Sequence, residues 1–218
     1  SQFTSALVIL LVFVSPIYGD FDYMQLVLTW PASYCYRPRY ICKRAAPNNF
    51  TIHGLWPDKE RRRLQFCTSK DYVLFDGSIV DDLERHWIQL RFDPQTARRD
   101  QPLWSDQYRK HGTCCYPRYD QNAYFLLAMR LKNNFDLLTT LRTHGITPGT
   151  KHTFKEIQDA IKTVTHQIDP DIKCVEHTLG VPELNEIGIC FTPAADRLFP
   201  CPQSKSCPKT GTMKILFR

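Results

Sequence analysis

The sequence lacks the features that would divide its 218 residues into several units. It contains no internal repeat, no low-complexity tract and no evident linker, and its 15 prolines are scattered rather than gathered into a spacer. A chain of this length with 43% hydrophobic residues can bury one sizeable core but not two. We therefore predict a single domain.

The first 19 residues carry no charge, and their apolar run from Ala6 to Val14 is too short to cross a bilayer core of about 30 Å. Such a run, followed by the small residue Gly19, is typical of a secretory signal peptide, here in a precursor that lacks its first few residues. We expect cleavage before Asp20, which leaves residues 20–218 as the mature domain. The alternative is a buried N-terminal strand.

The spacing required for a zinc site is missing as well. Cys114-Cys115 and the stretch from Cys201 to Cys207 are accompanied by no paired Cys-x-x-Cys and no matching His-x-x-x-His, so we predict no metal site. All nine cysteines follow the signal segment and fit disulfides formed in an oxidising compartment, which predicts a secreted, extracellular protein. Because nine is odd, one thiol lies outside the intramolecular pairs.

The expected strands and helices interleave without βαβ regularity, and there is no Gly-rich phosphate loop. Apolar alternation predicts strands at residues 24–30 and 50–55, the second ended by Pro57, and short strands near residues 187–191 and 213–217. This pattern indicates an α+β fold with a mostly antiparallel sheet packed against several helices.

Helical spacing of apolar residues appears in three regions. Ser78 is the expected N-cap of a helix with the apolar residues Val80, Leu83, Trp87 and Leu90. A second helical run follows Asp120, breaks near Asn133-Asn134 and stops at Gly145. Thr153 and Glu156 form a capping box for a third helix.

Two segments place a histidine beside a glycine: residues 49–58, NFTIHGLWPD, and residues 110–114, KHGTC. The first histidine, His53, falls on an expected strand, and His111 follows a helix suggested by Trp104 and Tyr108. Two imidazoles suffice for RNA cleavage, because one can take the proton of a ribose 2′-hydroxyl while the other protonates the leaving 5′-oxygen. The pair is a candidate acid–base couple that needs no metal or cofactor. A histidine considered alone is more often structural.

These two segments, with residues 24–31, 187–193 and 215–218, resemble the ribonuclease T2 family. The surrounding sequence is similar to its plant S-ribonuclease branch, from the pistils of self-incompatible Solanaceae. The resemblance covers nearly the whole mature chain. It implies the ribonuclease T2 fold and catalytic domain over residues 20–218, and an endoribonuclease whose product is a 2′,3′-cyclic phosphate.

The resemblance also implies catalytic roles: His111 as general base, His53 as general acid and Lys110 as the cation that binds the phosphate. The family pattern is similar to His-Glu-Trp-x-Lys-His, whereas residues 106–111 read Asp-Gln-Tyr-Arg-Lys-His. The third histidine and the glutamate are absent. Gln107 can form hydrogen bonds but cannot ionise, so we expect it to orient its neighbours, at some cost in rate.

Trp56 and Asp58 supply an aromatic face and a carboxylate beside His53, as stacking and edge recognition of an unpaired base require. Together with the family resemblance, this favours a substrate-binding role for both residues. The alternative for Trp56 is core packing.

The resemblance further implies four disulfides, with Cys115 left free or capped by a small thiol: Cys35–Cys42, Cys67–Cys114, Cys174–Cys207 and Cys190–Cys201. Asn49 begins the one Asn-x-Ser/Thr sequon of the chain and is the expected glycosylation site.

The net charge of +6 favours a polyanionic partner, although many secreted proteins are mildly basic. A basic cluster at Lys59, Arg61, Arg62 and Arg63 could steer RNA, could face a protein, or could be a solvated loop.

We predict a monomeric ribonuclease that acts on single-stranded RNA. The resemblance implies a pistil cytotoxin of gametophytic self-incompatibility, with an F-box pollen partner that reads residues 59–82. The alternatives are a defence or nutritional ribonuclease of the same family and a catalytically silent binding or storage protein.

Overall fold

The computed structural model describes residues 20–36, 41–176, 180–209 and 211–218, so the expected signal peptide lies outside the described residues. One eight-stranded sheet runs in the order β3-β2-β1-β6-β8-β4, and β5 and β7 also pair with β6. All of these pairings are antiparallel except the one between β6 and β8. The prediction of a single α+β domain with a mostly antiparallel sheet is confirmed.

The strands are β1 (Tyr23–Thr29), β2 (Thr51–Lys59), β3 (Arg62–Arg63), β4 (Lys151–Thr153), β5 (Asp171–Glu176), β6 (Pro182–Phe191), β7 (Leu198–Phe199) and β8 (Lys214–Leu216). The helices are α1 (Pro31–Cys35), α2 (Ser78–His86), α3 (Pro94–Asp100), α4 (Pro102–Lys110), the 3₁₀ helix η1 (Gly112–Cys115), α5 (Gln121–Asn133), α6 (Leu137–Thr143) and α7 (Phe154–Lys162). No helix among the described residues is long and apolar enough to cross a membrane.

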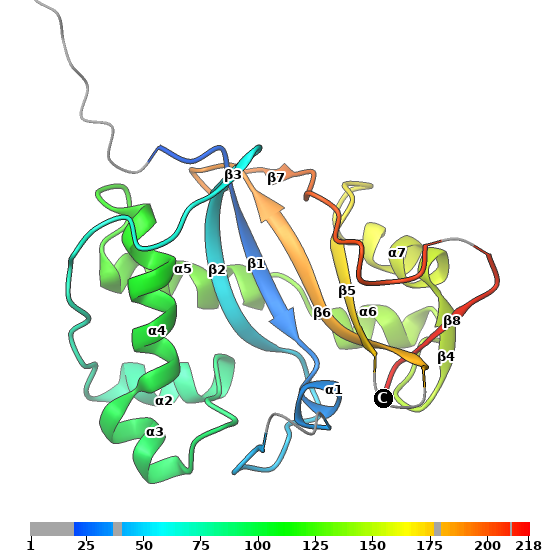
Figure 1. Cartoon of the computed structure of the whole chain (residues 1–218), viewed down its shortest axis with the longest axis horizontal. Coiled ribbons are helices and arrows are strands. Elements are labelled where there is room, and N and C mark those ends of the chain that lie inside the picture. The colour runs from blue at the N-terminus through cyan, green and yellow to red at the C-terminus, as the bar shows by residue number, and fades with distance from the viewer. Residues whose placement is uncertain (1–19, 37–40, 177–179, 210) are drawn as a thin grey trace, which may run out of the picture.

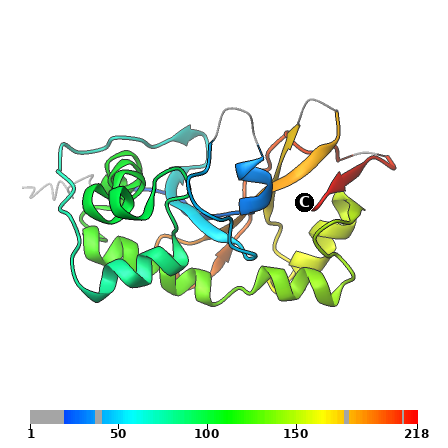
Figure 2. The same cartoon turned by 90° about the horizontal axis from the view of Figure 1, so that it is seen from below.

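Strands β2, β1 and β6 lie side by side at the centre of the molecule (Figure 1). Helices α2, α3 and α4 lie toward one end, and α6 and α7 lie with β4 and β8 toward the other (Figure 1). Helices α5 and α6, green and yellow-green, follow one another along one side of the sheet (Figure 2).

The core lies between this side of the sheet and α5. The even-numbered residues of β1, Met24, Leu26 and Leu28, are fully buried, as the period of two in a strand requires for one face. On β2, Leu55 is also fully buried, and its carbonyl oxygen accepts a hydrogen bond of 2.8 Å from the hydroxyl of Tyr124 on α5. The odd-numbered residues of β1 lie on the opposite face and include the buried polar side chains of Gln25 and Thr29.

Three predicted boundaries are wrong. The strand expected near residues 187–191 is β6, which begins at Pro182. Strand β2 continues through Pro57, because β3 pairs with β2 only at Asp58 and Lys59 and β2 is an edge strand at the proline. Helix α2 begins at Ser78, with Gly77 as N-cap, and ends at His86. The helix stops before Trp87 because two tertiary hydrogen bonds hold this residue. Its indole donates to the carbonyl of His53, and its backbone carbonyl accepts from the indole of Trp104.

The other expected elements match more closely. The break after α5 comes at Asn134, α6 ends just before Gly145, and the capping box of Thr153 and Glu156 begins α7. Strand β5 was not expected from the sequence. Helices α1 and α3 and the short strands β3, β4 and β7 were not expected either, because each is too short to show a period.

The structure pairs eight cysteines as Cys35–Cys42, Cys67–Cys114, Cys174–Cys207 and Cys190–Cys201. This is the pairing that the family resemblance implies, and Cys115 remains as a free, buried thiol. Burial raises the pKa of the Cys115 thiol, so the group is protonated and unreactive at neutral pH.

Candidate active site

His53 reaches the polar face of the sheet through a β-bulge. In the pairing of β1 with β2, Val27 lies opposite Gly54 and Leu28 lies opposite Ile52, so His53 is the extra residue. Simple alternation would place His53 on the same face as the buried Leu55. The bulge turns it instead toward Trp56, whose ring lies 5.2 Å from the His53 ring, nearly perpendicular to it.

Gly54 is required by the close contact next to it. A Cβ atom at this position would lie 2.1 Å from Nε1 of Trp56 and 2.3 Å from Oε1 of Gln107. These two atoms form a hydrogen bond of 2.9 Å, donated by the indole. Any side chain at position 54 would therefore separate Trp56 from Gln107, which explains the glycine after His53.

Helix α4 brings the second segment to the same place. Gln107 and Lys110 lie on its last turns, and His111 is the C-cap residue. The disulfide Cys67–Cys114 fastens the following 3₁₀ helix, and the carbonyl of Lys110 accepts a hydrogen bond from the backbone N–H of Phe66. The end of α4 is thus fixed at the point where His111 leaves it.

Trp56 is the centre of the site. The ring of His111 stacks on it with centroids 5.1 Å apart and an angle of 23° between the planes. The Nζ atom of Lys173, on β5, lies 4.7 Å from the centre of the indole. The two histidines, 58 residues apart in sequence, therefore contact the same indole.

A buried carboxylate that the sequence did not point to completes the site. Glu186 of β6 lies 2.5 Å from Nδ1 of His53, measured from its Oε1. The same oxygen accepts a hydrogen bond of 3.2 Å from Thr29, and the second oxygen lies 3.8 Å from Nζ of Lys173. Burial alone would raise the pKa of Glu186, but His53 and Lys173 hold it at about 2, so the carboxylate is ionised.

His111 has a different environment. Its side chain is 6% exposed, and Nδ1 is buried with no hydrogen-bond partner among the described residues. Burial, with the positive charges of Lys110, His53 and Arg63, lowers the pKa of His111 from 6.5 to about 3. The imidazole is therefore neutral at physiological pH and can accept a proton.

A cavity of about 580 Å³ opens over these residues. Its lining contains His53, Trp56 and His111, and its cations outnumber its carboxylates by seven to three. The cations are Lys59, Arg61, Arg62, Arg63, Lys110, Lys173 and Lys205. A cavity of this charge favours an anionic ligand.

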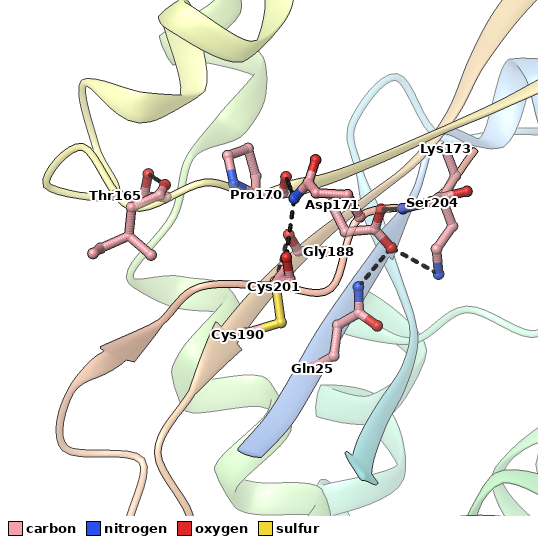
Figure 3. Close-up of a disulfide and its surroundings, with 11 residues drawn as sticks. Gln25, Thr165, Pro170, Asp171, Lys173, Gly188, Cys190, Cys201 and Ser204 are labelled. Atoms are coloured by element: carbon pink, nitrogen blue, oxygen red, sulfur yellow. Dashed lines mark hydrogen bonds and ion pairs between the residues drawn. A yellow bond between two sulfur atoms is a disulfide. The ribbon is translucent and has the colours of Figure 1, made fainter. Parts of the chain in front are cut away.

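One wall of the cavity is held by Asp171 at the start of β5. Its carboxylate accepts a hydrogen bond of 3.1 Å from Gln25 and one of 2.7 Å from the backbone N–H of Ser204 (Figure 3). The disulfide Cys190–Cys201 joins the same segment to β6. Residues 202–205, which line the cavity, are thereby fastened beside the histidines.

Comparison with known proteins identifies this arrangement. The model of the ribonuclease T2 family matches residues 21–201. The chain belongs to the ribonuclease T2 family. It is an endoribonuclease of the T2 type, as its two-histidine site and its relatives indicate.

The relatives and solved structures match this chain over nearly their whole length. Ribonuclease S-2 of Solanum tuberosum is 70% identical, with 100% of this chain and 98% of the relative covered. The crystal structure of the self-incompatibility-associated SF11-RNase of Nicotiana alata is 59% identical, covers 91% of this chain and 100% of its own, and superposes with a TM-score of 0.87. An RNase MC1 variant in complex with 5′-UMP is 27% identical, covers 92% of this chain and all of its own, and superposes with a TM-score of 0.78.

The structure of the ribonuclease brings five of the predicted residues together in one cavity: Trp56, its neighbours His53, Gln107 and His111, and Lys110. Asp58 also lines the cavity, and its Oδ1 accepts a hydrogen bond of 2.7 Å from the backbone N–H of Leu64 in the β2–β3 hairpin. Burial raises the pKa of Asp58. Asn49 is exposed and lies just before β2.

Sequence reasoning missed Glu186 and Lys173. The structure shows why Glu186 matters: strand β6 is buried along its whole length, and a carboxylate in such a strand needs a partner. Its partner His53 lies on β2, and only the strand order β2-β1-β6 brings the two residues together. No group of three or more His, Cys, Asp or Glu side chains among the described residues could hold a metal ion.

Proposed function

We propose that the ribonuclease cleaves single-stranded RNA by transphosphorylation, with His111 as general base and His53 as general acid and without a metal ion. The observation that carries this proposal is the pair of unlike imidazoles on Trp56. His111 is buried and neutral, whereas His53 is bound through Nδ1 to an ionised carboxylate. A base and an acid are needed in the same step, and these two environments suit those two tasks.

In this mechanism His111 takes the proton of the ribose 2′-hydroxyl. The 2′-oxygen then attacks phosphorus while the bond from phosphorus to the 5′-oxygen breaks. His53 protonates the departing 5′-oxygen, and the product is a 2′,3′-cyclic phosphate. Lys110, at the cavity wall, stabilises the charge that develops on the non-bridging oxygens.

Trp56 and Asp58 are proposed to bind a base of the substrate. Both residues line the cavity. The indole of Trp56 is half-buried, and its exposed part offers an aromatic surface to an unpaired base. One oxygen of Asp58 is taken by Leu64, and the other can accept a hydrogen bond from an amino group of a base. Gln107 is proposed to hold Trp56 in place through its amide oxygen.

Replacement of each histidine tests the mechanism. His53→Ala and His111→Ala should each lower cleavage of a dinucleoside phosphate by roughly 10²- to 10⁴-fold, the contribution of a general acid or base. His144→Ala, at an exposed position after α6, is the matched control and should leave the rate unchanged. Circular dichroism verifies that each variant is folded, and near-native activity in either active-site variant would refute the pairing.

The wider role rests on the relatives. We propose a secreted, N-glycosylated pistil ribonuclease of gametophytic self-incompatibility, a monomer recognised by a pollen partner of the F-box type. The names of the relatives from Solanum and Nicotiana, an S ribonuclease and a self-incompatibility-associated RNase, support the role in self-incompatibility. The exposure of Asn49 is compatible with a glycan there. Mass spectrometry of the pistil protein before and after removal of N-glycans would test the modification.

A further inference from the structure

Glu186 contacts His53, but the two-histidine mechanism assigns the carboxylate no task of its own. Glu186 is 8% exposed, and its Oε1 lies 2.5 Å from Nδ1 of His53. Burial of a charged carboxylate costs on the order of several kcal/mol unless partners compensate for the lost hydration. Thr29, Lys173 and His53 do so here, and His53 is the proposed general acid.

The carboxylate is held by residues directly across from it in the sheet. Glu186 pairs with Thr29 of β1 on one side and with Lys173 of β5 on the other. The hydroxyl of Thr29 donates to Oε1, and Nζ of Lys173 lies 3.8 Å from Oε2. Since both neighbours are fixed by strand pairing, the carboxylate has little freedom to turn away from His53.

The bulge in β2 completes the geometry from the other side. It directs His53 to the polar face, where Glu186 also lies, and the indole of Trp87 donates to the carbonyl of His53 at 3.0 Å. The imidazole thus has one nitrogen bound to Glu186. The nitrogen that remains for a ligand in the cavity is Nε2.

We propose that Glu186 is a positioning residue for the general acid: it accepts the Nδ1–H of His53 and so directs the Nε2 proton at the leaving 5′-oxygen. This inference rests on the proposed roles of the two histidines. An ionised carboxylate can only accept, so Nδ1 must carry a proton whenever the contact is made. The tautomer of the neutral ring is then fixed with Nε2 as the acceptor that is reprotonated after each turnover.

A pair of substrates separates this role from a structural one. The first is a dinucleoside phosphate, whose 5′-oxygen must be protonated to leave. The second is a ribonucleoside 3′-(4-nitrophenyl phosphate), whose nitrophenolate leaves without a proton. A residue that acts through the general acid affects the first substrate and spares the second.

Glu186→Gln should lower kcat/KM for the dinucleoside phosphate by about 10- to 100-fold, part of what a general acid contributes, and lower it by less than about threefold for the nitrophenyl ester. His53→Ala should show the same selectivity with a larger loss, and His111→Ala should lose activity on both substrates. Glu183→Gln is the control, because Glu183 lies on the same buried strand but binds Arg218. It should not discriminate between the substrates.

Each outcome decides a different claim. If Glu186→Gln matches the wild type on both substrates while His53→Ala is inactive on the first, Glu186 has no positioning role and the proposed function stands. Equal losses on both substrates would also overturn the inference, since they indicate a structural role or action through a base. Native activity of His53→Ala on the dinucleoside would refute the proposed function itself.

The wild-type ribonuclease provides a readout that does not depend on folding of a variant. ¹⁵N chemical shifts of the His53 ring distinguish its two neutral tautomers. The proposal predicts a proton on Nδ1 and an unprotonated Nε2 in the neutral ring. A neutral ring with the proton on Nε2 would overturn it.

Discussion

At the scale of single residues, the site depends on the different surroundings of two identical side chains. His53 lies at a bulge against an ionised carboxylate, and His111 lies in a buried position beside Lys110. One indole contacts both rings, so the distance between them is set by the position of Trp56. The hydrogen bond from Trp56 to Gln107, which a side chain at Gly54 would block, therefore affects both histidines at once.

The proposed role of His111 as general base predicts the pH dependence of cleavage. A general base works in its unprotonated form, and burial lowers the pKa of His111 to about 3, which extends the active range toward acid. At about pH 5 a histidine of ordinary pKa would be only about 3% neutral, whereas His111 should be almost entirely neutral. We predict that kcat/KM for a dinucleoside phosphate is still near its plateau at about pH 5. If kcat/KM instead fell to half its plateau at a pH near the ordinary pKa of histidine, the result would contradict the lowered pKa of His111.

At the scale of elements, the disulfide Cys67–Cys114 should matter for both stability and activity. It closes a sequence separation of 47 residues and fastens the segment next to His111. Loss of this link, as in Cys67→Ala with Cys114→Ala, should lower the free energy of unfolding by about 4 kcal/mol by the loop-entropy relation, and should lower kcat/KM. Denaturant unfolding and steady-state kinetics measure the two effects.

The control is Cys35→Ala with Cys42→Ala, whose separation is 7 residues; this disulfide starts from the last residue of α1, and neither cysteine lines the cavity over the histidines. The same relation gives a loss of about 2.5 kcal/mol, and kcat/KM should be unchanged. If the Cys35/Cys42 variant lost more activity than the Cys67/Cys114 variant, the Cys67–Cys114 disulfide would have no specific role in positioning His111.

The elements also show what could be predicted from sequence. The alternation of β1 and the capping box of α7 are local patterns, and both were predicted correctly. The bulge at His53 depends on the pairing of β2 with β1, and the contact of Glu186 with His53 depends on the order of three strands. Neither is encoded in a local period, so the histidines could be identified from the sequence while the carboxylate between the strands could not.

At the scale of the whole molecule, the cavity over the two histidines and the segment proposed for partner recognition are neighbours. The basic residues Arg61, Arg62 and Arg63 line the cavity, whereas Val73 and Leu74 lie farther along the segment and are 69% and 56% exposed. Residues 59–82 therefore present both a charged part next to the active site and an apolar part away from it.

Exchange of residues 59–82 for those of another allele tests the proposed recognition. We predict that the chimera cleaves RNA at a nearly native rate and rejects a different set of pollen, because exposed residues at an interface can change partner choice with little effect on the fold. The measurements are an RNA cleavage assay and pollination of plants that express the chimera. An active, stable chimera with unchanged specificity would exclude recognition by this segment alone.

The central claim, acid–base cleavage by two histidines, is tested most directly by the identity of the first product. A dinucleoside phosphate incubated with the ribonuclease in the presence of a metal chelator can be followed by ³¹P NMR. The account predicts undiminished turnover and the early accumulation of a nucleoside 2′,3′-cyclic phosphate. Loss of activity with the chelator, or direct formation of a linear monophosphate with no cyclic intermediate, would contradict it.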